Sequence, residues 1–206
     1  MQAHPSPFTR NLRSALVAIA AVALAAAPAI AADDKGAFAV RGVGSDRCDA
    51  FLAAVAAKDG LKLERYGSWL LGYVSASNRL IGRTFDAVPS QVPTDVLGIV
   101  AVICRNQPAA LVDTAASQAL VVLNPIRMTA DSPLITVSNA GRTLQVRTEA
   151  LITLQQNLAK KGLYKGPADG KLSPQLAKII ADFQLKEKIL ISGLPDLDTI
   201  IRAGLK

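Results

Sequence analysis

Capping and turn residues divide the last third of the sequence into three short segments with helical spacing. The segment 150–161 stops at Gly162, a residue type that commonly ends helices. Ser173 can cap the next segment, and Pro174 fits its first position because no backbone donor is needed there. Asp196 can cap the third segment. Three short amphipathic helices of this kind predict a small orthogonal bundle.

The preceding region, 42–123, has the same three- and four-residue spacing of apolar residues, which indicates four more helices. We expect these helices at 48–55, 66–80, 94–104 and 110–123, with a break at Gly60. Two β-prone runs, 134–137 and 143–146, flank the turn formers Asn139 and Gly141 and indicate a hairpin. The fold class is therefore mainly α, with two small helical domains joined by a short β-hairpin. We expect the chain to divide into a leading segment at 1–32, a helical domain at 42–123, a linker with the hairpin at 124–148 and a second helical domain at 149–206.

The first division, 1–32, has the pattern of a secretory signal peptide. Residues 14–32 form an uncharged run that is mostly alanine, preceded by Arg10 and Arg13 and followed by the first acidic residue, Asp33. A positive start, an apolar run and a small-residue exit at 29–31 predict export and cleavage after residue 31 or 32. An uncleaved membrane anchor is the alternative. We expect a periplasmic protein with no stable membrane span after cleavage.

The two cysteines, Cys48 and Cys104, both lie beyond this segment. An even number of cysteines in an exported chain favours a structural disulfide. A free redox-active pair is the alternative, but the C-x-x-C spacing typical of such pairs is missing. Loss of Arg10 and Arg13 with the signal lowers the net charge of +7 by two, to +5. The remaining basic residues are scattered, so we expect no nucleic-acid partner.

The single histidine, His4, lies in the predicted signal peptide. The mature chain would therefore lack the base of Ser-His and Cys-His catalysis and the ligand of histidine metal sites. We expect no cofactor, no metal and no catalytic residue. A glycosidase with two carboxylates needs no histidine, but the acidic residues form no recognisable motif of that kind.

An ordered set of residues near the C-terminus carries a resemblance to a known family. The set is Leu154-Gln155, Leu158, Gly162-Leu163-Tyr164, Gly166, Asp169-Gly170, Phe183-Gln184, Gly193, Asp196 and Thr199. It resembles the peptidoglycan-binding domain found on many wall hydrolases and periplasmic proteins, over nearly all of 149–206. Leu176 and Ile179 depart from the family pattern, at positions that face helix packing. The resemblance implies a module that binds the bacterial wall without reacting with it.

A shallow groove with one aromatic and a few polar groups would suit such a ligand. The candidate contacts are Tyr164, Lys165, Asp169 and Gln184. Each has a structural alternative: Tyr164 as a core cap, Asp169 as part of a turn, and Gln184 as a side chain that holds a loop.

The N-terminal helical region has a looser resemblance. Its skeleton is Cys48-Asp49-Ala50-Phe51, Trp69-Leu70-Leu71-Gly72-Tyr73, Asn78 and Val102-Ile103-Cys104-Arg105-Asn106-Gln107-Pro108. It resembles small disulfide-bonded periplasmic domains related to acid-stress chaperones and some immunity-type proteins. The leading hypothesis is a non-catalytic protein that binds peptidoglycan through 149–206 and an envelope protein through 42–123. The alternatives are a chaperone-like or inhibitor protein, and an accessory subunit or targeting part of a wall hydrolase.

Overall fold

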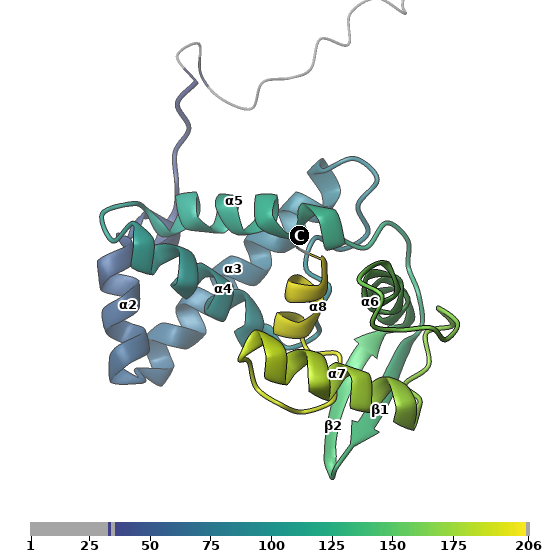
Figure 1. The fold of residues 1–206 in the computed structure, drawn as a ribbon. Coiled ribbons are helices and arrows are strands. Elements are labelled where there is room, and N and C mark those ends of the chain that lie inside the picture. The colour runs from purple at the N-terminus through teal and green to yellow at the C-terminus, as the bar shows by residue number, and fades with distance from the viewer. Residues whose placement is uncertain (1–32, 34–35, 205–206) are drawn as a thin grey trace, which may run out of the picture. The chain divides into compact units, whose positions relative to one another are not determined.

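Helices dominate the computed structural model, which describes residue 33 and residues 36–204 (Figure 1). The predicted signal peptide, residues 1–32, lies outside the described residues. The elements are η2 (Gly42–Ser45), α2 (Cys48–Ala57), α3 (Gly60–Leu80), α4 (Pro93–Asn106), α5 (Val112–Leu123), η3 (Asn124–Ile126), β1 (Leu134–Asn139), β2 (Arg142–Arg147), α6 (Thr148–Lys160), α7 (Pro174–Glu187) and α8 (Leu197–Gly204). The predicted class, mainly α with a short hairpin, is confirmed.

The second helix begins six residues earlier than the sequence pattern indicated. α3 starts at Gly60, and the Asp59 side chain caps it by accepting a hydrogen bond from the Lys62 backbone N–H at 3.1 Å. The preceding helix ends through Lys58, which adopts a left-handed conformation (φ 52°). The expected break at Gly60 was therefore misplaced by two residues. A capping aspartate satisfies a backbone donor that would otherwise be unpaired, and this outweighs the low helix propensity of glycine.

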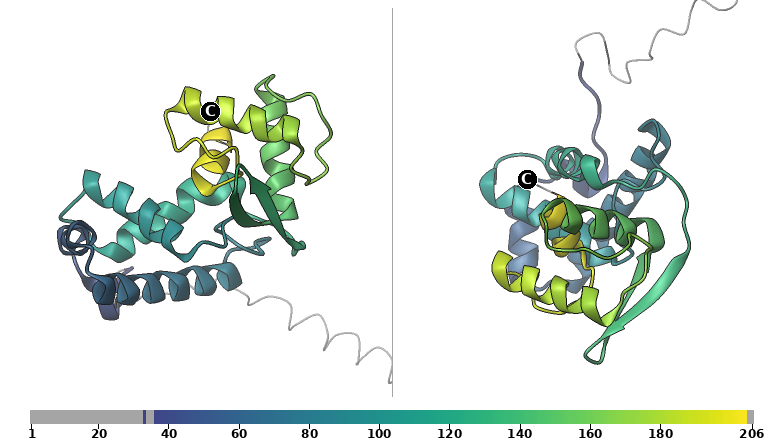
Figure 2. Two further views of the ribbon diagram at one scale, coloured as in Figure 1. Left: turned by 90° about the horizontal axis from the view of Figure 1, so that it is seen from below. Right: turned by 45° about the vertical axis from the view of Figure 1, so that its right-hand side comes forward.

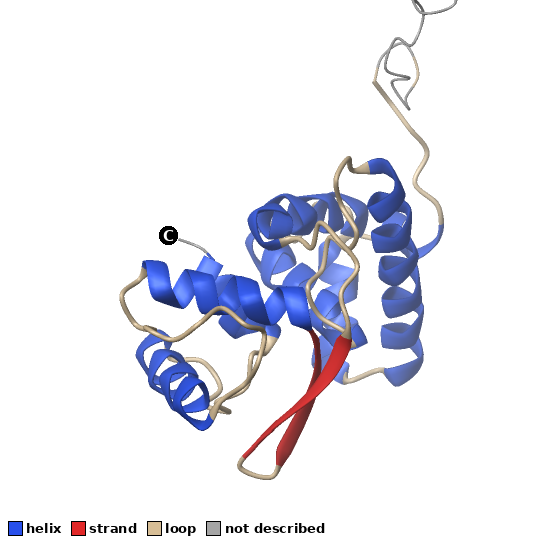
Figure 3. Cartoon of the chain, turned by 90° about the vertical axis from the view of Figure 1, so that its right-hand side faces the viewer, coloured by secondary structure: helices blue, strands red, loops and turns tan. Residues whose placement is uncertain are grey.

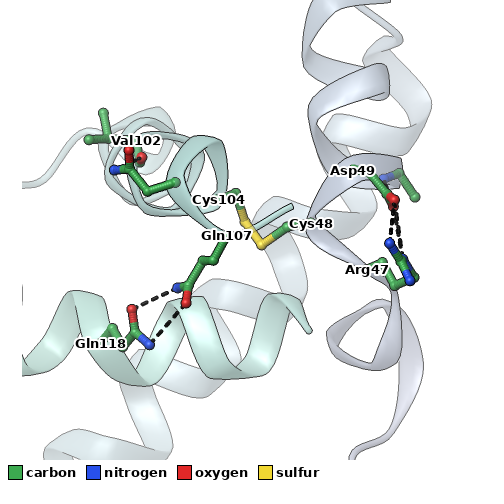
Figure 4. Close-up of a disulfide and its surroundings, with 9 residues drawn as sticks. Arg47, Cys48, Asp49, Val102, Cys104, Gln107 and Gln118 are labelled. Atoms are coloured by element: carbon green, nitrogen blue, oxygen red, sulfur yellow. Dashed lines mark hydrogen bonds and ion pairs between the residues drawn. A yellow bond between two sulfur atoms is a disulfide. The ribbon is translucent and has the colours of Figure 1, made fainter. Parts of the chain in front are cut away.

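The predicted disulfide joins α2 to α4. Cys48 and Cys104 are fully buried, with an S–S distance of 2.03 Å (Figure 4). The bond closes a loop with a sequence separation of 56 residues. Beside it, the side-chain amides of Gln107 and Gln118 form a reciprocal pair at 2.7 and 3.3 Å, which ties the end of α4 to α5. These links supplement the hydrophobic core, which runs as one cluster from Cys48 to Ala203.

Trp69 fixes the turn that leads into the N-terminal helices. Its indole N–H donates to the Arg41 carbonyl at 2.8 Å, and its ring occupies the space where a side chain on Gly44 would lie. The ring also stacks on Tyr73, with centroids 5.4 Å apart. Both aromatics are half-buried, so they serve the packing of this region.

The hairpin contacts the C-terminal helices as well as linking them to the rest of the chain. β1 and β2 are antiparallel, with Leu134 opposite Arg147 and Asn139 opposite Arg142 (Figure 3). At the tip, the Asn139 amide donates to the Ser192 carbonyl at 2.8 Å. The hairpin therefore packs against the loop before α8.

The three C-terminal helices form the bundle that their caps predict. α8 contacts α6, α7 and η3, and the two further views show these green to yellow helices gathered together (Figure 2). The Ser173 side chain accepts from the Leu176 backbone N–H at 3.1 Å. The Asp196 carboxylate accepts from the Thr199 backbone N–H at 2.9 Å. Both predicted caps are confirmed.

Glu149, at the start of α6, ties this bundle to the chain before the hairpin. One carboxylate oxygen accepts from the Thr129 backbone N–H at 3.0 Å and from its hydroxyl at 3.1 Å. The other accepts from the Ala130 backbone N–H at 3.3 Å. Next to it, the Arg147 guanidinium lies 4.9 Å from the centre of the Phe85 ring. The chain from Val40 onward forms one compact unit.

Candidate functional site

Two buried glutamines organise the loops of the C-terminal bundle. Gln155, on α6, is fully buried. Its carbonyl oxygen accepts from the Gly170 backbone N–H at 2.8 Å, and its amide donates to the Asp169 carboxylate at 3.0 Å and the Lys171 carbonyl at 3.2 Å. Gly170 has a φ of +71°, and a Cβ there would collide with Thr148. The α6–α7 loop is thus held at its C-terminal end.

Gln184, on α7, does the same for the loop before α8. Its carbonyl oxygen accepts from the backbone N–H groups of Ser192 and Gly193, both at 2.8 Å. Its amide donates to the Thr199 hydroxyl at 2.8 Å and to the Leu194 carbonyl at 3.0 Å. The side chain is fully buried. A ligand at the surface would therefore not reach it without displacing this loop.

Tyr164 lies under the α6–α7 loop. Only 6% of the residue is exposed, and its hydroxyl donates to the Pro167 carbonyl at 3.1 Å. A side chain at Gly166 would collide with the phenol. The ring supports the loop from below and offers no open face to a ligand.

Lys165 and Asp169 are the two sequence-predicted site residues that the structure leaves exposed, and both lie on the α6–α7 loop. Hydrogen bonds from the Gln155 amide and the Lys171 backbone N–H hold the pKa of the Asp169 carboxyl below its usual value. Asp169 is therefore ionised at neutral pH. The four predicted residues do not converge on one spot: two support loops from inside, and two are solvated.

A groove of about 250 Å³ opens beside α7. Its lining residues are Leu163, Ile179, Asp182, Phe183 and Lys186. The four α7 members follow the spacing i, i+3, i+4 and i+7, which places them on one helix face. Leu163, the first residue after the glycine that ends α6, closes the other side. Among the described residues, this groove is a candidate ligand site on the surface of the bundle.

The groove combines an apolar floor with charges of both signs. Phe183 is 4% exposed, so the ring forms part of the floor without projecting. Leu163 is 38% exposed on the opposite wall. Asp182 pairs with Lys178 at 2.8 Å, while the structure gives Lys186 no ion-pair partner among the described residues. Hydrophobic and polar groups in one concavity are what small-molecule sites share.

The sequence interpretation missed this groove. It assigned Ile179 to the interior, whereas the residue is half-buried at the groove wall. Asp182 and Lys186 lie three and seven residues further along the same face, a signal that was readable before the structure. The sequence could not identify Leu163 as a groove residue, because its position depends on how the chain after α6 lies against α7. Leu176, the other departure from the family pattern, is fully buried.

A second groove, of about 380 Å³, lies between α3 and α5. Tyr73 and Ser117 form part of its lining, and Val121 at its edge is 72% exposed. Across the described chain, no three histidine, cysteine or carboxylate groups are arranged to hold a metal ion. None of the helices that could be searched combines the length and apolar content of a membrane span.

Comparison with known proteins identifies one region. Residues 147–202 match the family model described as putative peptidoglycan binding domain. Neither the curated proteins nor the solved structures gave a match. The family match and the buried disulfide together indicate a protein outside the cytoplasm. The matched segment begins at the last residue of β2 and covers α6, α7 and most of α8, so the C-terminal region of this chain is a peptidoglycan-binding domain-like module.

Proposed function

We propose that the protein is a non-catalytic periplasmic protein that binds peptidoglycan through residues 149–206. The observation that carries this proposal is the family match over 147–202, on a bundle whose loops are pinned by Gln155 and Gln184. Loops fixed in this way present a surface at little entropic cost on binding. The predicted signal peptide at 1–32 would deliver that surface to the wall.

Binding would be non-covalent and would use the exposed face of the module. Lys165 and Asp169 on the α6–α7 loop are available for hydrogen bonds and ion pairs with amides and carboxylates of the wall. Tyr164 and Gln184 contribute by keeping the two loops in place. The loss of His4 with the signal peptide favours recognition over catalysis in the mature chain.

Co-sedimentation with purified insoluble peptidoglycan tests the proposal. The chain from Asp33 to the C-terminus should pellet with the wall and stay in the supernatant without it. The variant Lys165→Glu should pellet less, whereas Lys62→Glu, on the distant helix α3, should pellet as the wild type does. Failure of the wild type to pellet would refute the proposal. Release of muropeptides into the same supernatant would instead identify an enzyme.

The N-terminal helices would engage a protein partner. The groove between α3 and α5 lies beside Val121, and Leu80 at the end of α3 is 83% exposed. Large exposed apolar side chains beside a groove are typical of protein contacts. A photo-crosslinking residue in place of Val121 should give a defined adduct in living cells, and the same residue in place of Lys62 should not. Suppression of client aggregation at low pH would favour the chaperone alternative.

A further inference from the structure

We infer that the α7 groove recognises the peptide stems of peptidoglycan and not its sugars. The inference rests on the proposed wall binding and adds which part of the polymer is bound. It concerns the groove lined by Leu163, Ile179, Asp182, Phe183 and Lys186. None of these five residues was among the contacts that the sequence pointed to.

The aromatic side chains of the matched segment are almost fully buried. The matched segment contains two aromatic side chains, Tyr164 and Phe183, and their exposed fractions are 6% and 4%. An aromatic ring that holds a sugar presents its face to the ligand. Tyr164 instead directs its hydroxyl to the Pro167 carbonyl beneath the loop. The Tyr164 ring therefore serves the core of the module, and Phe183 contributes to the groove floor without projecting a ring face toward a sugar.

The side chains that line the groove have the chemistry to recognise a peptide. Its walls are the aliphatic side chains of Leu163 and Ile179, and its charges are an ammonium on Lys186 and a carboxylate on Asp182. A stem peptide carries the matching groups in sequence: alanine methyls, the free carboxylate of a glutamyl residue, and the free ammonium and carboxylate of a diamino acid. Lys186 is one helical turn from Asp182, so a zwitterionic peptide can meet both charges while its methyl groups contact the apolar walls.

The volume of the groove limits the size of the ligand that it can hold. Sites for drug-sized ligands occupy about 300–1,000 Å³. The groove, at about 250 Å³, lies just below this range, so it has room for a few peptide residues. The Lys178 side chain already neutralises part of the Asp182 charge at 2.8 Å, and a ligand ammonium can replace it because both side chains are largely exposed.

The test compares four probes on the chain from Asp33 onward. The probes are insoluble peptidoglycan, the same glycan after an amidase has removed its peptides, a soluble stem tetrapeptide, and a chitin tetrasaccharide. The wall and the tetrapeptide should bind, the tetrapeptide should shift the NMR amide signals of Ile179 and Lys186, and the stripped glycan should bind at least tenfold less.

Variants locate the site. Lys186→Glu and Leu163→Ser should each weaken tetrapeptide binding about three- to tenfold, as expected for one partly exposed contact. Arg202→Glu, an equal charge change on α8 outside the groove, should bind as the wild type does. Thermal unfolding of all three variants checks that the fold is retained.

Each outcome separates the inference from the proposed function. Equal binding to whole wall and stripped glycan, or equal effects of Lys186→Glu and Arg202→Glu, would overturn the inference and leave wall binding intact. A wild-type chain that binds no form of peptidoglycan would overturn both.

Discussion

The substitution Gln184→Leu should destabilise the C-terminal module severely. Leucine is an apolar residue of similar volume but leaves the backbone N–H groups of Ser192 and Gly193 without their acceptor, each now bonded at 2.8 Å. An unsatisfied buried donor costs about 1–3 kcal/mol. Two donors at a middle value of about 2 kcal/mol each give a loss of about 4 kcal/mol in the free energy of unfolding.

Two matched substitutions calibrate this value. Gln155→Leu removes the acceptor of one backbone donor, Gly170, and should cost about 2 kcal/mol, half as much. Gln118→Leu removes an exposed amide that pairs only with the side chain of Gln107, and should cost less than about 0.5 kcal/mol. Urea unfolding followed by far-UV circular dichroism measures all three.

The order of the three losses is the critical result. A Gln184→Leu variant within about 1 kcal/mol of the wild type would show that the glutamine is not needed to hold the loop. Its side chain would then be free for a ligand, as the sequence first indicated. A larger loss for Gln155→Leu than for Gln184→Leu would refute the counting of unsatisfied donors.

Three further predictions follow from other parts of the chain. Glu149→Ala should cost about 1 kcal/mol, because the donors that it frees are exposed and can bond to water. It should also separate the far-UV circular dichroism transition, which reports all helices, from the Trp69 fluorescence transition, which reports the N-terminal helices; coincident transitions would contradict this prediction. Burial raises the pKa of Asp95 above 3.8, and the nearby carboxylates of Asp198 and Asp196 add to the shift. Ionisation of Asp95 therefore opposes folding. The stability that protonation of Asp95 provides is complete below pH 3.8 and is lost as pH rises through the raised pKa. The melting temperature of the Asp95→Asn variant should therefore rise relative to that of the wild type as pH increases from 3.8 through the raised pKa. Replacing Cys48 and Cys104 with alanine should cost about 2–4 kcal/mol, measured by urea unfolding, and an unchanged midpoint would exclude a stabilising disulfide.

Local signals in the sequence were sufficient for the bundle. The caps at Ser173 and Asp196 and the stop at Gly162 depend on residues a few positions apart, so they can be read without tertiary information. The hairpin could also be predicted from near neighbours in the sequence. The same holds for whether each segment forms a helix or a strand. The start of α3 was misplaced because Asp59 acts through its side chain, whereas the interpretation weighed only the propensity of Gly60.

The candidate site was harder to predict because burial decides which polar residues can meet a ligand. Tyr164 and Gln184 stand out in the sequence for the same reason that they are buried: each forms hydrogen bonds that hold a loop. Spacing alone does not separate such a residue from one that binds. The groove requires the chain after α6 to lie beside α7, which brings Leu163 to the face of Ile179 and Lys186.

The sequence by itself determined the helical class, the hairpin, the positions of the caps and the family of the C-terminal region. Each of these depends on contacts between near neighbours in the chain or on an ordered motif. Only the tertiary structure decided that Gln155 and Gln184 serve the loops, that Lys165 and Asp169 remain at the surface, and where the α7 groove opens. These features depend on distant segments meeting and excluding water, which no local pattern specifies.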